Sequence, residues 1–121
     1  MAYDQYSWPR LTATIASGAS LSAAVNVSRS NVIGIIMSTG WTAAALTFQA
    51  SIDGDNFFDL YDQAGTETNI PTAALRFVGG LDALNFGSFN YLKVRSGTTG
   101  TPVNQAASRE LTLVLRNAGG Y

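Results

Sequence analysis

The feature that most constrains this chain is an alternation of apolar and polar side chains, repeated in short segments between turn residues. In residues 46–52 the apolar side chains occupy every second position, and residues 90–96 and 110–116 follow the same pattern. A period of two is typical of a strand with one buried face. We therefore expect sheets, and we find no convincing amphipathic helix.

Eight segments are predicted as strands. They are residues 11–16, 21–27, 32–37, 46–52, 57–61, 74–78, 90–96 and 110–116. Turn residues separate them at the spacing expected of a sandwich or barrel. Because two packed sheets bury such faces, the predicted fold is all-β: a single-domain antiparallel β-sandwich of jelly-roll type with about eight strands. Residues 32–37 are almost continuously apolar, which suits a strand covered on both faces.

The 121 residues suffice for one domain. We predict an N-terminal extended arm over residues 1–10, a β-sandwich over residues 11–116, and a C-terminal tail over residues 117–121. Pro9 stiffens the exit from the arm into the domain.

Charge is scarce in this chain. Charged residues make up 12% of it, against the usual ~25%, and the net charge is −1. A neutral surface suits a subunit that packs against copies of itself. No basic block or apolar run of membrane-spanning length is present, so we expect neither nucleic acid nor membrane as a partner. The first residues lack a secretory signal, so the protein is expected in the cytoplasm until it joins a larger assembly.

Few side chains of this chain are of the types that support catalysis or metal binding. The chain has no His and no Cys, which removes most nucleophile–base pairs and the usual zinc sites. A hydrolase could still use two carboxylates. The candidates are Asp4, Asp53, Asp55, Asp59, Asp62, Glu67, Asp82 and Glu110. Most lie in or beside turns, where Asp caps the backbone, so we expect no enzyme, no catalytic residue and no cofactor.

Two segments invite a ligand interpretation. Residues 53–56 (DGDN), followed by Asp59 and Asp62, suggest calcium, but the glycine and distal glutamate of an EF-hand are out of place. We favour a two-residue Asp-Gly hairpin without metal. Residues 97–101 are glycine-rich but no lysine follows them, so we favour a flexible loop over a phosphate-binding loop.

Aromatic residues are the remaining candidates. Trp41 is interpreted as core or sheet-edge packing, with stacking on a glycan as the alternative. Tyr and Trp are favoured anchors at interfaces. The arm and tail are therefore the predicted partner-binding segments. Their residues are Tyr3, Tyr6, Trp8, Arg10 and Tyr121.

Four stretches carry a resemblance to a protein group. They are residues 40–54 (GWTAAALTFQASIDG), 57–62 (FFDLYD), 91–98 (YLKVRSGT) and 102–106 (PVNQA). These stretches resemble small structural proteins of tailed bacteriophages and prophages. They are also similar to the discoidin-like sandwich, although this chain lacks the disulfide usual in that group and no ligand site is carried over.

The resemblance implies a virion protein. We expect a capsid decoration, or cement, protein that binds the outer surface of the phage head and stabilises capsomer junctions. Its partners would be the major capsid protein and copies of itself in a homo-oligomer, with a trimer suited to three-fold junctions. It would be assembled in the cytoplasm of the bacterial host. A head spike, a fibre base, a tail accessory protein and a carbohydrate-binding module for host attachment are the alternatives.

Overall fold

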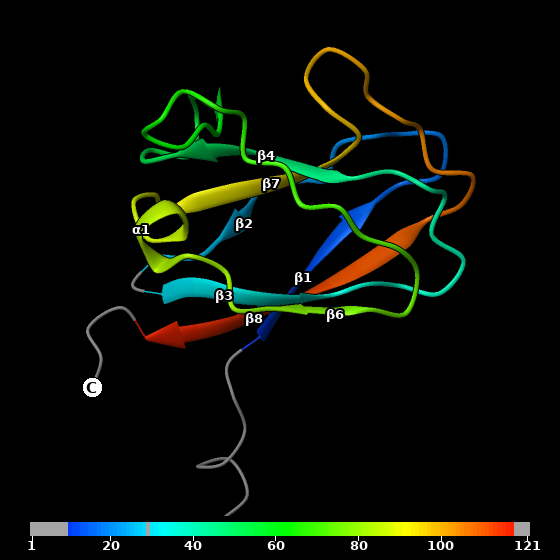
Figure 1. Ribbon diagram of the computed structural model, residues 1–121, viewed down its shortest axis with the longest axis horizontal. Coiled ribbons are helices and arrows are strands. Elements are labelled where there is room, and N and C mark those ends of the chain that lie inside the picture. Colours follow the sequence, from blue (N-terminus) through cyan, green and yellow to red (C-terminus); the bar gives the residue numbers. More distant parts are fainter. Residues whose placement is uncertain (1–9, 29, 118–121) are drawn as a thin grey trace, which may run out of the picture.

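The computed structural model describes residues 10–28 and 30–117 and is an all-β sandwich (Figure 1). The strands are β1 (Arg10–Ile15), β2 (Val25–Asn26), β3 (Ser30–Ile36), β4 (Leu46–Ser51), β5 (Phe58–Asp59), β6 (Phe77–Gly79), β7 (Tyr91–Ser96) and β8 (Arg109–Asn117). One helical turn, α1 (Ala83–Phe86), precedes β7 and lies at one end of the sandwich. The predicted antiparallel β-sandwich of about eight strands is confirmed.

The strand order is that of a jelly roll. One sheet runs β1-β8-β3-β6 and the other β2-β7-β4-β5, with antiparallel neighbours throughout. Along the chain, every connection crosses from one sheet to the other except the one between β4 and β5. This double-sheet winding pairs strands that are far apart in sequence.

The core lies between the two sheets and follows the alternation of the sequence. Its fully buried members on the first sheet include Ile15, Val32, Ile35, Leu111 and Leu113, and those on the second include Leu46, Phe48, Leu92 and Val94. Phe86 of α1 closes one end, with its ring edge-on to Phe48 at a centroid distance of 5.1 Å.

Three predicted elements differ from the structure. The segment 21–27 forms only the short strand β2, because Ser22 bonds to Val94 through both its backbone N–H and its hydroxyl. β6 lies further along the chain than predicted and includes Gly79. The segment 82–88, expected to be irregular, contains α1, whose turn is closed by N–H groups bonding to the Asp82 carbonyl.

The hairpin between β4 and β5 exists, but its loop is longer than the predicted two residues. Gln49 pairs with Asp59 and Ala50 with Phe58, so residues 52–57 form the loop. The Ser51 hydroxyl accepts from the N–H of Gly54 at 2.9 Å. This side-chain hydrogen bond stabilises the wider turn, in which no backbone ladder bonds join the two strands.

The first and last strands extend one residue beyond the predicted sandwich. β1 begins at Arg10 and β8 ends at Asn117. Arg10, expected in the arm, and Asn117, expected in the tail, are therefore strand residues. No helix in the described part of the chain is long and apolar enough to cross a membrane.

Candidate binding surfaces

The outward side of β3 is open to solvent. Val32 and Ile35 point inward and are fully buried, whereas Ile36 points outward and is 38% exposed. A bulge between Val32 and Gly34 places Ile33 as an extra residue, and Ile33 lines a hollow on the same outer side. The prediction that this strand is covered on both faces is therefore wrong for the isolated subunit.

Neighbouring strands extend this apolar surface. Phe77 of β6 is the cross-strand partner of Ile36 and is 63% exposed. Val114 of β8 pairs with Gly34 on the other side of β3. Ile33, Ile36, Phe77 and Val114 together are called the outer apolar face below. Ile36 and Phe77 are the exposed members of this face, Ile33 is half-buried and Val114 is 9% exposed. Exposed apolar side chains side by side on adjacent strands are of the kind that marks an interaction site.

A groove of about 470 Å³ lies within this face and is called the outer groove. It is lined by Ile33, Gly34, Phe77, Gly79, Gly80, Leu81, Val114 and Arg116. Three of these residues are glycines, so part of the groove floor is bare backbone. Arg116 supplies the charged group of the lining and already has an interaction within the subunit.

Arg10 is the predicted partner-binding arm residue that the structure describes. It is exposed, and its Cα pairs with that of Val114. Because cross-strand partners point to the same side of a sheet, Arg10 lies beside the outer groove. The other predicted partner residues, Tyr3, Tyr6, Trp8 and Tyr121, lie outside the described residues.

Trp41 belongs to the hydrophobic core, as its leading interpretation expects. It is 7% exposed, and its indole N–H donates to the carbonyl of Ala44 at 3.0 Å. Stacking on a glycan needs an exposed ring face, and a ring buried to this degree has none to offer.

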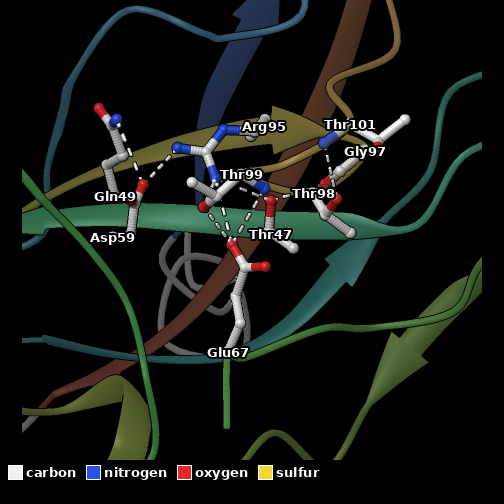
Figure 2. A network of polar contacts seen from close by, with 9 residues as sticks. All are labelled: Thr47, Gln49, Asp59, Glu67, Arg95, Gly97, Thr98, Thr99 and Thr101. Atoms are coloured by element: carbon white, nitrogen blue, oxygen red, sulfur yellow. Dashed lines mark hydrogen bonds and ion pairs between the residues drawn. The ribbon is translucent and has the colours of Figure 1, made fainter.

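Arg95 forms the centre of a polar network on the outer side of the second sheet (Figure 2). The alternation predicted it outward on β7, yet it is 6% exposed. Its guanidinium forms ion pairs with Asp59 of β5 and with Glu67, the latter at 3.3 Å. It also donates to the hydroxyls of Thr99 at 2.8 Å and Thr47 at 3.2 Å.

This network joins two loops to the sheet. Glu67 comes from the loop after β5 and Thr99 from the loop after β7, and the Thr99 backbone N–H also donates to Glu67 at 3.2 Å. The hydrogen bond from Arg95 holds the pKa of Asp59 below its usual range. Both carboxylates are thus paired with a cation, an arrangement that suits a structural clamp better than two-carboxylate hydrolysis.

Two further acidic candidates, Asp53 and Asp62, cap turns. The Asp53 carboxylate accepts from the N–H groups of Asp55 and Asn56, both at 2.9 Å, and these bonds lower its pKa. Asp62 accepts from the N–H groups of Ala64 and Thr66 at 3.0 Å. These bonds account for both carboxylates as turn caps. Among the described residues, no group of three or more acidic side chains is placed to hold a metal ion.

Asp62 and Asp82 line a polar hollow of about 190 Å³ together with Gln63 and Asn85. The Asn85 amide donates to the Thr68 hydroxyl at 2.7 Å. The sequence did not indicate this neighbourhood, because its residues lie in two separate loops.

Sequence reasoning also missed Gln105, which follows the glycine-rich residues 97–101. Its side chain is fully buried and makes four hydrogen bonds. It accepts from the Thr42 N–H and from Arg109, and it donates to the Thr42 carbonyl and to Ser96. The loop after β7 is therefore anchored on both sides of the sandwich.

A second apolar hollow, of about 250 Å³, lies at the β5 edge of the other sheet. Ile52 and Phe58 line it and are 73% and 71% exposed. It is smaller than the outer groove and provides a comparison surface for experiments.

Fold and surfaces together define a jelly-roll sandwich with an open apolar sheet face. Comparison of the chain with protein-family models, curated proteins and solved structures gives no match. The resemblance to phage structural proteins therefore stays a prediction.

Proposed function

We propose that this protein is a structural subunit of a bacteriophage particle, in the role of a capsid decoration protein. The single observation that carries the proposal is the outer apolar face, on which Phe77 and Ile36 remain exposed in the folded subunit. Apolar patches of this kind on a sheet mark surfaces that other proteins cover. The partners proposed are the major capsid protein and further copies of this chain.

The lining of the outer groove supports a protein partner over a small ligand. Small-molecule sites combine apolar walls with a few convergent polar groups. In the outer groove the side chains are apolar apart from Arg116, and the glycines contribute only backbone. A surface of this composition suits packing against another protein segment.

The energy available from this face fits an assembled subunit. Burying what is exposed of Phe77 would contribute roughly 1–2 kcal/mol, and that of Ile36 less. One such contact is weak, but a homo-oligomer of this chain would make several linked contacts at once, which makes the combined binding strong. The sparse charge of the chain supports the same role, since little charge must be desolvated when its surface is buried.

Paired surface variants test this function. A double variant, Ile36→Thr with Phe77→Ser, removes the exposed apolar groups of the first sheet. A matched double variant, Ile52→Thr with Phe58→Ser, does the same at the edge of the second sheet. Each is added to particles of the encoding phage that lack the protein, and the bound copies are counted after sedimentation.

We expect the first variant to bind at least tenfold more weakly and the second to bind like the wild type. Circular dichroism and the unfolding midpoint check that both variants are folded. Undiminished binding by a folded Ile36→Thr, Phe77→Ser variant would overturn the proposal.

A further inference from the structure

We infer that the outer groove receives residues 1–9 of a second copy of this chain, with Tyr6 and Trp8 as the side chains that enter it. This inference rests on the proposed function, because it names the occupant of the same face. It follows from where the described chain begins, from the shape of the groove and from the sequence of the preceding segment.

The described part of the chain begins at Arg10, on a row of residues that crosses the groove. Arg10 pairs with Val114, Val114 with Gly34, and Gly34 with Gly79. These four positions form one line across all four strands of the sheet. Arg10, to which residues 1–9 are attached, therefore lies on the edge strand of the sheet that carries the outer apolar face.

The reach of that segment is sufficient to occupy a neighbour's groove. Nine residues span up to about 30 Å when extended. Crossing the sheet from β1 to β6 requires three strand spacings, or about 14 Å. A subunit placed beside another can thus lay this segment over the full width of the facing sheet.

The chemistry of the segment matches that of the groove. Tyr6 and Trp8 are two residues apart, so both point to one side of an extended chain. Aromatic rings pack well on bare backbone, and Gly80, where a Cβ would meet nothing within 4 Å, supplies such backbone. The apolar lining of the groove therefore suits these two aromatic side chains.

Pro9 favours a second copy over the chain's own groove. Proline has no N–H and cannot extend the ladder between β1 and β8. The residue before a proline is biased to extended conformations, so Trp8 is poorly suited to the tight reversal that a return to its own sheet requires. This bias supports a neighbour's groove over the chain's own as the binding site.

Disulfide trapping tests the inference, and the absence of native cysteines keeps the experiment clean. One protein carries Ser7→Cys, which keeps both aromatic residues. The other carries Gly79→Cys, whose Cβ would lie 3.7 Å from the Phe77 ring, an ordinary contact distance. The two full-length proteins are mixed at equal, high concentration and oxidised. A matched mixture replaces Gly79→Cys with Asp55→Cys, which is exposed on the β4–β5 loop.

We expect a covalent heterodimer joining positions 7 and 79, identified by peptide mapping, at a yield at least fivefold above the Asp55→Cys mixture. Adding Tyr6→Ala and Trp8→Ala to the Ser7→Cys protein should reduce this yield to the control level. An equal yield with Asp55→Cys would overturn the inference. A third protein carries both Ser7→Cys and Gly79→Cys and is oxidised alone. If a disulfide formed only within this single chain and not between the two mixed proteins, the inference would also be overturned, because that result places the segment in its own groove.

Failure of the inference can be distinguished from failure of the proposed function. If the Ile36→Thr, Phe77→Ser variant loses particle binding but no trapped heterodimer forms, the outer apolar face binds another partner and only the inference fails. If that variant still binds particles, the proposed function fails whatever the trapping shows.

Discussion

The ring of Phe77 lies over the backbone of Gly34, so that a Cβ added at Gly34 would come within 2.9 Å of the Phe77 Cε1 atom. Glycine at this position lets the ring lie against the sheet and form one wall of the outer groove. The shape of the candidate binding surface therefore depends on a residue that has no side chain of its own.

Substituting Gly34→Ala should weaken binding and also cost some stability. The added methyl displaces the exposed Phe77 ring and comes within 3.2 Å of the Val78 carbonyl oxygen, so we expect the free energy of unfolding to fall by about 1–2 kcal/mol. Binding to particles should fall severalfold. Urea denaturation and a particle-binding assay measure the two effects. Gly100→Ala, where a Cβ meets nothing within 4 Å, is the control, and an equal loss of binding there would contradict the account.

Gly97→Ala should be strongly destabilising. Gly97 has a φ of +90°, and its Cβ would stand 2.5 Å from the Thr101 carbonyl oxygen and 2.7 Å from the Val103 nitrogen. Because backbone cannot move aside as a ring can, we expect a loss of about 2–4 kcal/mol. Gly18 also has a positive φ but open space around it, so Gly18→Ala should lose about 1 kcal/mol. Chemical denaturation measures the free energy of unfolding of both variants. If the two variants lost similar amounts, the close backbone contacts around Gly97 would not contribute to its cost.

Removing the central cation of the polar network should also destabilise the fold. Arg95→Met leaves Asp59 and Glu67, whose side chains are 30% and 18% exposed, without their shared cation. We expect a loss of about 2–3 kcal/mol, below the range for fully buried pairs because water reaches both carboxylates. Lys93→Met, on the same side of β7, loses a cation–π contact with Phe57 and should cost less than about 1 kcal/mol. The account of the network would fail if both variants unfolded at the same urea concentration.

Stability should decrease in acid, partly through Asp59. Its pKa is lowered in the folded protein by the Arg95 hydrogen bond, so the folded state favours the charged carboxylate. The stabilisation is complete above the pKa of the unfolded chain, near 4, and is lost as the pH falls through the lower folded value. Asp53 contributes in the same direction.

Asp59→Asn should therefore show a shallower loss of stability than the wild type between about pH 5 and pH 2, with the part due to Asp53 retained. Urea unfolding across this range provides the measurement. If the free energy of unfolding changed with pH in the same way in both proteins, the ionisation of Asp59 would not be linked to folding.

Gln105→Ala should lose about 2–4 kcal/mol, because it leaves the Thr42 N–H and carbonyl without their partner inside the protein. The neighbouring Asn104 is exposed, and Asn104→Ala should change stability by less than about 0.5 kcal/mol. Thermal unfolding compares the two variants. A Gln105→Ala protein as stable as the control would contradict the role of Gln105 as an anchor.

The alternation in the sequence predicted the longer strands β1, β3, β4, β7 and β8 to within two residues, because the period of two is a local property of the backbone. It placed Arg95 on the outer side of its strand correctly, but it could not predict that two distant loops bury that side chain. Gln105 was missed for the same reason, since its partners come from other parts of the chain. The apolar run that contains Ile33 and Ile36 has the same sequence pattern as a strand whose second face is covered by its own chain, so the pattern does not distinguish that cover from a partner protein. Only the structure shows that the face is open.

The proposed function predicts that the gene for this chain lies in a phage or prophage genome, and purified particles of that phage provide its most direct test. Quantitative mass spectrometry of purified heads gives the number of copies of this protein per major capsid subunit. The account predicts a fixed, stoichiometric ratio that is maintained through repeated purification and drops when Ile36 and Phe77 are replaced by Thr and Ser. Absence of the protein from purified particles, or a trace amount that washes away, would contradict it.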